Sequence, residues 1–443
     1  MNFAESSALK RAAREEGWQE AENPDEAGLI LLYTCSVRLT AEQRVMGRLA
    51  HYASLKKKGK NFTLVVAGCM AERKAEILKA EIPAVDYVFG TSSRSFFPQI
   101  LKAIEQDQKA ELTGEKPVFT FSSSHLEEGS FRSFIPIMHG CNNFCSYCIV
   151  PLVRGPEISR NPFDILSEIR LAAEKGVREI TLLGQNVNSY EWQGRLEFKE
   201  NSKFQKNFGF SELLELIARE VENTPIKWLR FLSSHPKDLS AETIRVMAEH
   251  PVFCRHLHLC VQHGSDPILK AMNRRYTRQQ YLELVHSLRS AMPDISLSTD
   301  ILVGFPGETE ADLEQTLSLM EEVKFLYAYM YHYNPREGTA AFDLPNRIPA
   351  DIKRKRLDRV IELQKLHTAE LLKNRSGAEA TVLIEGISKK NADELVTRTE
   401  RDEMAVVQGR RSWIGCFGRL TLDSPRGNTF RARDLKLLEP VSL

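Results

Sequence analysis

The sequence has 443 residues, which is enough for two to four domains, each with a substantial hydrophobic core. Its formal net charge is +1, so overall charge does not indicate a strongly basic nucleic-acid-binding protein. The sequence contains no run of eighteen apolar residues and no signal peptide, which predicts a cytoplasmic protein without a membrane partner. The eight cysteines should then be reduced and free to bind metal.

Residues 1–108 predict a parallel α/β domain. Apolar runs of strand length at 28–33, 63–68 and 86–90 alternate with helical stretches, as in parallel sheets. Cys35 and Cys69 follow the first two of these runs. Because the carboxyl ends of parallel strands share one edge of a sheet, the two thiols should lie near each other. Both a shared metal cluster and two simply packed thiols remain possible.

A polar stretch at 106–129 predicts a linker, after which a second domain, 127–367, alternates strand and helix six times. Six βα units predict a partial TIM-like (β/α)6 barrel, whose active site lies on the loops after the strands. A long polar loop at 193–210 predicts a mobile segment or a lid. The predicted strands are 134–139, 179–183, 228–233, 256–261, 296–303 and 327–333.

Glycines and polar residues follow every one of the six predicted strands. Gly184, Gln185 and Asn186 follow the second strand, and Gln262 follows the fourth. Ordinary turn chemistry explains any single cluster, but six clusters on one face of a barrel indicate a ligand site.

The loop after the first barrel strand carries Cys141, Cys145 and Cys148 in a C-x-x-x-C-x-x-C arrangement. Zinc sites usually collect four ligands as two separated pairs, whereas three thiolates on one loop suit a 4Fe–4S cluster with one iron left open. The alternatives are a zinc knuckle without its fourth ligand and three unrelated thiols.

Residues 376–441 predict a small antiparallel β-barrel of OB type, because short β-rich runs alternate with Gly and Asn turns. Six arginines lie in this segment with Trp413 and Phe417 between them, and cations beside exposed aromatic rings suit looped RNA. An ordinary solvated surface is the alternative. The runs are 380–385, 394–399, 405–408, 416–422 and 429–437, and the arginines are Arg410, Arg411, Arg419, Arg426, Arg431 and Arg433.

Several long motifs, taken together, resemble the radical S-adenosylmethionine methylthiotransferases, and within them the tRNA methylthioadenosine synthases. The three segments match the N-terminal methylthiotransferase domain, the radical S-adenosylmethionine domain and the RNA-binding TRAM domain of that family, in order. The resemblance implies transfer of a methylthio group to carbon 2 of N6-isopentenyladenosine beside the tRNA anticodon. The motifs are Thr34-Cys35-Ser36-Val37-Arg38, Ala67-Gly68-Cys69, and the segments 140–160, 183–190 and 303–309.

The resemblance also implies cofactors and roles. Cys141, Cys145 and Cys148 would hold a 4Fe–4S cluster that cleaves one S-adenosylmethionine to a 5′-deoxyadenosyl radical. Cys35 and Cys69 would hold a second 4Fe–4S cluster that presents the sulfur, and a second S-adenosylmethionine would supply the methyl group. The implied partners of a monomeric enzyme are tRNA with isopentenylated adenosine and an electron donor such as flavodoxin or ferredoxin. From their loop positions, the residues expected around S-adenosylmethionine are Tyr147, Gly184, Gln185, Asn186 and Gln262.

The sequence departs from the family pattern at its start and at Cys260. The family has a further N-terminal strand that ends in Gly-Cys-Gln-Met-Asn, whereas this sequence starts at Met1-Asn2, so we expect the reading frame to begin upstream. Cys260 replaces a usual Pro, and we interpret it as a packed thiol. Two other functions remain possible: methylthiolation of threonylcarbamoyladenosine in tRNA or of a ribosomal protein, and a non-catalytic role as an RNA-binding iron–sulfur protein.

Overall fold

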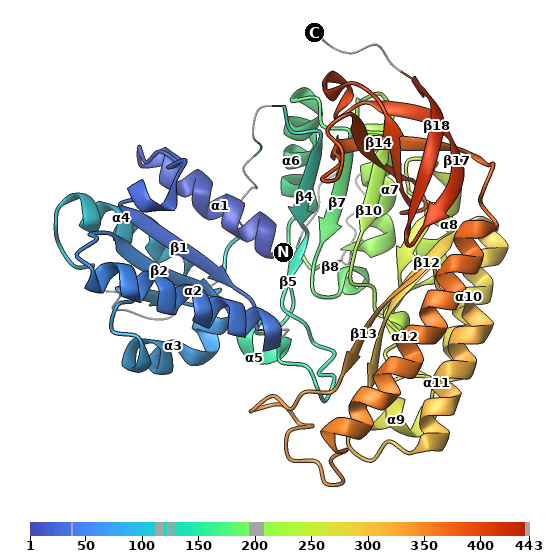
Figure 1. Ribbon diagram of the computed structural model, residues 1–443, viewed down its shortest axis with the longest axis horizontal. Helices are drawn as coiled ribbons and strands as arrows, with labels where there is room; N and C mark the ends of the chain where they lie inside the picture. Colours follow the sequence, from blue (N-terminus) through green and yellow to red (C-terminus); the bar gives the residue numbers. More distant parts are fainter. Residues whose placement is uncertain (37–38, 111–118, 122–125, 127–128, 195–207, 439–443) are drawn as a thin grey trace.

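The computed structural model describes the chain except residues 37–38, 111–118, 122–125, 127–128, 195–207 and 439–443. An N-terminal α/β unit, a central barrel and a C-terminal β-barrel follow one another along the chain (Figure 1), which confirms the predicted fold class. Much of the predicted linker and most of the predicted lid fall outside the described residues.

The N-terminal unit is a sheet of three parallel strands in the order β1-β2-β3. Its central strand is buried on both faces: Leu64 and Val66 pack into one hydrophobic cluster, and Val65 and Ala67 pack into another. This explains the continuous apolar run in the sequence. The elements are α1 (Asn2–Glu15), a 3-10 helix (Pro24–Glu26), β1 (Leu29–Thr34), α2 (Leu39–Lys57), β2 (Thr63–Gly68), α3 (Cys69–Glu81), β3 (Tyr87–Phe89), a 3-10 helix (Arg94–Phe96) and α4 (Phe97–Glu105).

The central barrel is built from two parallel three-stranded sheets, β4-β7-β10 and β11-β12-β13. Isolated bridges between Leu229 and Phe253 and between Ser234 and Leu259 join the sheets at β10 and β11. Among the described strands, β4 and β13 each have one neighbour in these sheets, so the barrel is open between them. The strands are β4 (Arg132–Pro136), β7 (Glu179–Leu183), β10 (Trp228–Phe231), β11 (His256–His258), β12 (Ser296–Val303) and β13 (Tyr327–His332).

Helices cover the outer face of this barrel (Figure 1). Leu297 and Ile301 of β12 pack into the core beneath the helices, whereas Ser298 and Asp300 alternate with them and face inward. The helices are α5 (Val150–Arg154), α6 (Pro162–Glu174), α7 (Phe210–Val221), α8 (Ala241–Glu249), α9 (Asp266–Ala271), α10 (Arg278–Ala291), α11 (Glu310–Val323) and α12 (Ala350–Lys373). Smaller elements are β5 (Met138–His139), β6 (Ile158–Ser159), β8 (Glu191–Trp192), β9 (Phe208–Gly209), and 3-10 helices at Val187–Ser189 and Pro236–Asp238.

The C-terminal unit is a closed five-stranded barrel in the order β14-β15-β16-β18-β17. Its neighbouring strands are antiparallel, apart from the parallel pair β16 and β18. The expectation that Phe417 is exposed is wrong: Phe417 is 3% exposed, because its ring packs against Trp228 of the central barrel at 4.9 Å between centroids. The elements are β14 (Glu379–Ile387), β15 (Glu394–Thr399), β16 (Met404–Gln408), a 3-10 helix (Arg411–Trp413), β17 (Phe417–Arg426) and β18 (Thr429–Leu437).

The C-terminal barrel is fixed to the amino ends of the central strands. Arg398 contacts Glu179 at 2.6 Å, and Arg230 donates to the Thr399 carbonyl at 2.8 Å. Ser296, at the start of β12, donates its hydroxyl to the Arg401 carbonyl of the C-terminal barrel at 2.6 Å. This arrangement leaves the carboxyl ends of the strands, on the opposite side, for the candidate site. Within the described parts of the chain, none of the helices has the length and apolar character needed to cross a lipid bilayer.

Candidate functional site

The loop between β5 and α5 brings Cys141, Cys145 and Cys148 together. Gly140 opens the loop with φ +78°, and a Cβ there would lie 1.9 Å from the Pro156 carbonyl oxygen. Only glycine fits this close approach. Within the loop, the amide of Cys148 donates to the Cys145 carbonyl at 2.9 Å, which turns the chain back on itself.

The three thiols lie within electrostatic range of one another. Burial raises the pKa of Cys141 to about 11 and that of Cys148 to about 12, and the neighbouring thiol of Cys145 adds to both shifts. A metal bound between the sulfur atoms would reverse this effect by displacing the protons. Three sulfur donors on one loop fit a 4Fe–4S cluster that keeps one iron open.

Arg274 lies against this loop and was not singled out in the sequence. Its guanidinium donates to the Cys145 sulfur at 3.3 Å, to the Cys260 carbonyl at 2.5 Å and to the Tyr276 hydroxyl at 3.0 Å. The residue is 3% exposed, and no carboxylate among the described residues lies within ion-pair distance of it. No pattern in the sequence distinguishes buried Arg274 from its exposed neighbour Arg275.

The second cysteine pair lies at the edge of the N-terminal sheet. Thr34 and Gly68 end β1 and β2 in register, so Cys35 and Cys69 follow at the same edge. A Cβ on Gly68 would lie 2.6 Å from the Thr34 carbonyl oxygen, and the amide of Met70 donates to the Thr34 hydroxyl at 3.2 Å. Burial raises the pKa of the Cys69 thiol, and the nearby Cys35 contributes.

A buried ion pair connects the two cysteine sites. Arg154, at the end of α5, donates to both carboxylate oxygens of Glu5 at 2.5 and 2.8 Å, and its positive charge opposes the burial that raises the pKa of the Cys69 thiol. Tyr33 donates its hydroxyl to Glu5 at 3.1 Å. Burial alone would raise the pKa of Glu5, but Arg154 lowers it to about 2. The helix that follows the cysteine loop is therefore tied directly to the edge that carries the second pair.

The residues after β7 lie among buried polar side-chain atoms that have no hydrogen-bond partner in the described structure. A Cβ on Gly184 would lie 2.4 Å from Met138, so the backbone approaches β5 closely here. Asn186 donates to Asp238 at 2.7 Å, which joins this loop to the loop after β10. Buried side-chain atoms without a hydrogen-bond partner in the described structure include Gln185 Oε1, Ser234 Oγ and His235 Nε2. Such atoms are costly unless a ligand pairs with them, so these strand ends fit a polar cofactor.

Tyr147 and Gln262 border the same face from other elements. The Tyr147 ring packs in a cluster with Phe305 and Tyr333, and burial raises its pKa well above the usual range. Gln262 has φ +71°, and its backbone hydrogen-bonds Asp300 and Leu302 of β12 at 2.9 and 2.8 Å. A non-glycine residue held at positive φ is typical of functional sites.

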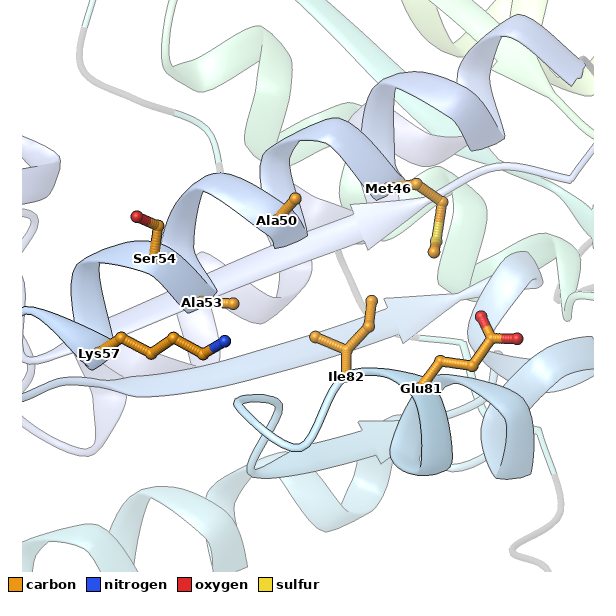
Figure 2. Close-up of a pocket in the computed structure, with 7 residues that line it drawn as sticks. All are labelled: Met46, Ala50, Ala53, Ser54, Lys57, Glu81 and Ile82. Carbon is orange, nitrogen blue, oxygen red and sulfur yellow. The ribbon is translucent and has the colours of Figure 1, made fainter.

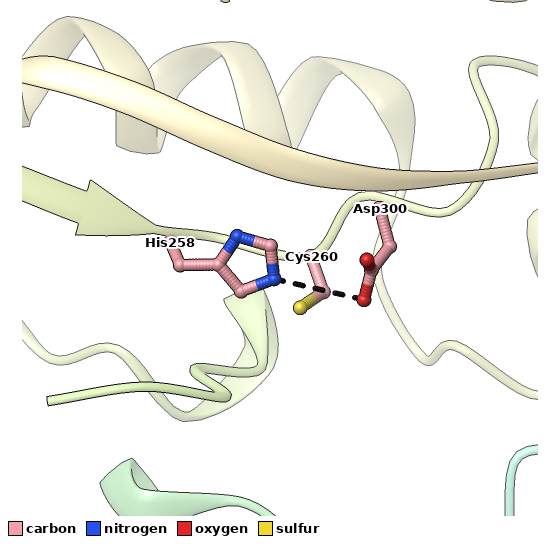
Figure 3. Close-up of side chains that lie close together, drawn as sticks. All are labelled: His258, Cys260 and Asp300. Carbon is pink, nitrogen blue, oxygen red and sulfur yellow. Dashed lines mark ion pairs between the residues drawn. The ribbon is translucent and has the colours of Figure 1, made fainter. Parts of the chain in front are cut away.

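Further inside the barrel, His258, Cys260 and Asp300 converge (Figure 3). Their ligand atoms all lie within 4.8 Å of one another, and His258 Nε2 is 3.6 Å from Asp300 Oδ2. The other ring nitrogen of His258 lies 2.9 Å from the Ser298 hydroxyl. Cys260, interpreted from the sequence as a packed thiol, is half-buried beside this carboxylate.

A groove of about 460 Å³ lies elsewhere, between α2 and the end of α3 (Figure 2). Its lining combines apolar groups of alanine, methionine and isoleucine with the Ser54 hydroxyl, Lys57 and Glu81, and it contains no thiol. Its lining offers no chemistry that resembles the sites above. The lining residues are Met46, Ala50, Ala53, Ser54, Lys57, Glu81 and Ile82.

Comparison with known proteins gives two family matches. Residues 135–320 match the radical SAM superfamily, and residues 1–90 match the uncharacterized protein family UPF0004. The segments that carry the two cysteine sites lie within these matches.

Curated relatives match over nearly the whole chain. A tRNA-2-methylthio-N(6)-dimethylallyladenosine synthase from Treponema denticola is 48% identical over 98% of this chain and 97% of its own length. One from Geobacter sulfurreducens is 39% identical over 97% of this chain and 94% of its own length. Among solved structures, the radical S-adenosylmethionine methyltransferase TsrM from Kitasatospora setae has a TM-score of 0.58 at 14% identity, covering 76% of this chain and 73% of TsrM. That last likeness supports the fold alone.

Proposed function

The chain belongs to the tRNA-2-methylthio-N(6)-dimethylallyladenosine synthases, and from this membership we propose which of its residues carry the reaction. The protein is a radical S-adenosylmethionine enzyme that replaces the hydrogen on carbon 2 of N6-isopentenyladenosine in tRNA with a methylthio group. This carbon is an unactivated aromatic position, so its chemistry requires a cofactor rather than a side-chain base. The observation that carries the assignment of residues is the convergence of three thiols on one loop.

Cys141, Cys145 and Cys148 hold the radical 4Fe–4S cluster in this proposal. When bound there, the cluster supplies the electron that cleaves S-adenosylmethionine. Arg274 offsets part of the negative charge of the thiolates, because its guanidinium donates to Cys145 and has no carboxylate partner in the described structure. Its burial keeps water from competing for that hydrogen bond.

The loops after β7 and β11 orient S-adenosylmethionine. The partnerless Gln185 oxygen supports this role, and Gly184 leaves room for close backbone approach. Asn186 fixes the loop through Asp238. The full proposed set is Tyr147, Gly184, Gln185, Asn186 and Gln262.

Cys35 and Cys69 would hold the second 4Fe–4S cluster, which would supply the sulfur. Their common position at the sheet edge supports this assignment, as does the nearby positive charge of Arg154, which opposes the burial that raises the pKa of Cys69. A second S-adenosylmethionine supplies the methyl group.

Three functional units are proposed: residues 1–108 for sulfur insertion, 127–367 for radical chemistry and 376–441 for tRNA binding. Exposed arginines on the C-terminal barrel support the last of these, since phosphate contact needs accessible cations. They are Arg410, Arg411, Arg419, Arg426 and Arg433, of which Arg433 also pairs with Asp434; Arg431 is half-buried and pairs with Glu394.

The enzyme works as a monomer in the cytoplasm, where its thiols stay reduced and a flavodoxin or ferredoxin supplies single electrons. Eight free cysteines support a reducing compartment.

The test is anaerobic reconstitution with iron and sulfide, followed by reductant, S-adenosylmethionine and isopentenylated tRNA. Wild type should form 5′-deoxyadenosine and methylthio-nucleoside. Cys145→Ala should abolish both products, whereas Cys69→Ala should lose the methylthio-nucleoside and keep 5′-deoxyadenosine. Cys254→Ala, a buried thiol at the junction with the C-terminal barrel, is the matched control. Full methylthio-nucleoside formation by Cys145→Ala would refute the assignment.

A further inference from the structure

We propose that Arg336 is a positioning residue, which together with Glu42 holds the sheet edge that carries Cys35 and Cys69 in place against the barrel. Arg336 lies on the loop after β13, and Glu42 lies on α2, 294 positions earlier in the chain. The inference rests on the proposed function, because it names residues that would place the two halves of that reaction relative to each other.

On the N-terminal side, Glu42 joins the two helices that follow the cysteine pair. Glu42 lies in the first turn of α2, shortly after Cys35, and α3 begins at Cys69 itself. Arg73 lies one turn beyond Cys69 on the same side of α3, and it donates to both carboxylate oxygens of Glu42 at 2.7 and 2.9 Å. Lys74 adds a contact at 3.3 Å. The Glu42 carboxylate therefore holds the starts of both helices together.

On the barrel side, Arg336 is connected to the cysteine loop through a few hydrogen-bonded residues. Its carbonyl accepts hydrogen bonds from the amide and the hydroxyl of Thr339, at 3.1 and 2.7 Å, which turns the chain. The amide of Ala341 then donates to the carbonyl of Ser146 at 2.7 Å. Because Ser146 lies in the middle of the cysteine loop, the position of that loop and the position of Arg336 depend on each other.

The contact between the two sides is charged and buried. Arg336 Nη1 donates to Glu42 Oε1 at 3.2 Å, and the two side chains are 9% and 4% exposed. Little water screens a pair at this depth, so its strength depends closely on geometry. Separating the partners would leave buried charges without compensation, so the contact favours one arrangement of the surfaces that it joins.

The loop that carries Arg336 also touches α5, the helix that leads from the cysteine loop to the N-terminal unit (Figure 1). A Cβ on Gly338 would lie 3.1 Å from Leu152 of that helix, and the next helix residue, Val153, packs against Cys69. The N-terminal unit is therefore held at two points, at Cys69 by α5 and at α2 by Arg336. Two attachments restrict rotation of the unit as well as its separation from the barrel.

A fixed orientation matters because the two cysteine sites must act on the same carbon atom. Cleavage of S-adenosylmethionine at the cysteine loop does not require the second site, whereas sulfur insertion requires that site close to the target carbon. A displacement of about 1 Å from a reactive geometry can cost about a hundredfold in rate. Loss of the contact should therefore uncouple the reaction, so that S-adenosylmethionine is cleaved while less sulfur is inserted.

The test compares Arg336→Met, Arg336→Lys and Glu42→Gln in the full-length enzyme after anaerobic reconstitution. The matched control is Arg278→Met, which also removes a contact between distant elements, that of Arg278 with Glu322 at 3.1 Å on the outside of the barrel. The first measurement is the amount of 5′-deoxyadenosine formed per methylthio-nucleoside. The second is the distance between the two reduced clusters, from pulsed electron paramagnetic resonance. The third is hydrogen–deuterium exchange of residues 334–344, before and after reconstitution.

Arg336→Met should raise the ratio of 5′-deoxyadenosine to methylthio-nucleoside by about tenfold or more, at an unchanged rate of 5′-deoxyadenosine formation. Glu42→Gln should behave in the same way, because it removes the other partner. Arg336→Lys should retain most of the wild-type coupling, because it keeps a cation near Glu42. Arg336→Met should also broaden the distribution of cluster distances and speed the exchange of residues 334–344. Arg278→Met should match wild type in all three measurements.

A wild-type product ratio in Arg336→Met, combined with a lower melting temperature, would overturn the inference, because the pair would then only stabilise the fold. An equal rise of the ratio in Arg278→Met, or unchanged exchange of residues 334–344 in Arg336→Met, would also overturn it. Failure of the proposed function would look different, because wild-type enzyme would then form no methylthio-nucleoside. The exchange comparison would still decide whether Arg336 holds its loop in place.

Discussion

The buried pair between Glu5 and Arg154 predicts that Glu5→Gln strongly destabilises the folded protein. The Glu5 side chain is 2% exposed and that of Arg154 is 4% exposed. Removing one partner leaves the guanidinium buried without its counter-charge, which typically costs about 3–5 kcal/mol in the free energy of unfolding. Since the pair joins α1 to α5, the loss should separate the N-terminal unit from the barrel.

The pKa of Glu5 gives an independent magnitude. Lowering the pKa of Glu5 from 4.5 to about 2 corresponds to about 3 kcal/mol of folded-state stabilisation, at about 1.36 kcal/mol per pKa unit. Because the folded-state pKa is the lower one, this stabilisation is fully present above pH 4.5 and is lost as the pH falls toward about 2. Glu5→Gln should therefore show a flatter decline of stability over that acidic interval than wild type.

The assay is urea denaturation of the cluster-free protein, followed by tryptophan fluorescence, for Glu5→Gln, Arg154→Met and the double variant. Arg170 and Glu220 form a matched exposed control, with the same two-bond geometry at 2.7 and 2.8 Å. Glu220→Gln should cost about 0–1 kcal/mol. The double variant should cost less than the sum of the single ones, because neither charge is left unpaired. A Glu5→Gln cost no larger than that of Glu220→Gln would refute the reasoning.

Three further outcomes are expected. Arg274→Met should shift the reduction potential of the radical cluster by about 60 mV to more negative values, because a charge-stabilising hydrogen bond to Cys145 is lost. The control Arg275→Met, at an exposed position, should leave the potential unchanged. A redox titration followed by electron paramagnetic resonance measures both potentials. Gly140→Ala should lower iron incorporation after reconstitution, while Gly155→Ala, with nothing within 4 Å of its Cβ, should lower it less. Arg398→Met should lower the melting temperature, because it removes one of the two arginine partners from both Glu179 and Glu385 at the junction of the two barrels; an unchanged melting temperature would contradict this.

The sequence predicted most strands because local patterns determine them. The expected bounds of β7 and β12 match the structure, since each strand ends just before a glycine, Gly184 or Gly304. The cysteine loop was equally predictable as a cluster site, because all three of its thiols lie within eight residues.

Long-range pairs were not predictable in the same way. Glu5 and Arg154 lie 149 positions apart, and nothing local indicates that either is buried. The sequence also did not predict that Asp300 faces into the barrel, because Asp300 lies in an otherwise buried strand and its surroundings depend on the pairing of β12 with β11 and β13. Phe417 was misjudged because aromatic residues beside arginines look alike whether they meet RNA or another domain.

Helix α5 has a consequence for how the two cysteine sites move. Only Ile149 separates Cys148 from this five-residue helix, and Ile149 and Val153 pack against Cys69. The distance between the two cysteine sites is therefore determined by the length of helix α5 rather than by a hinge between domains. A displacement of the cysteine loop is therefore transmitted through α5 to the edge that carries Cys69, so the two cysteine sites move together.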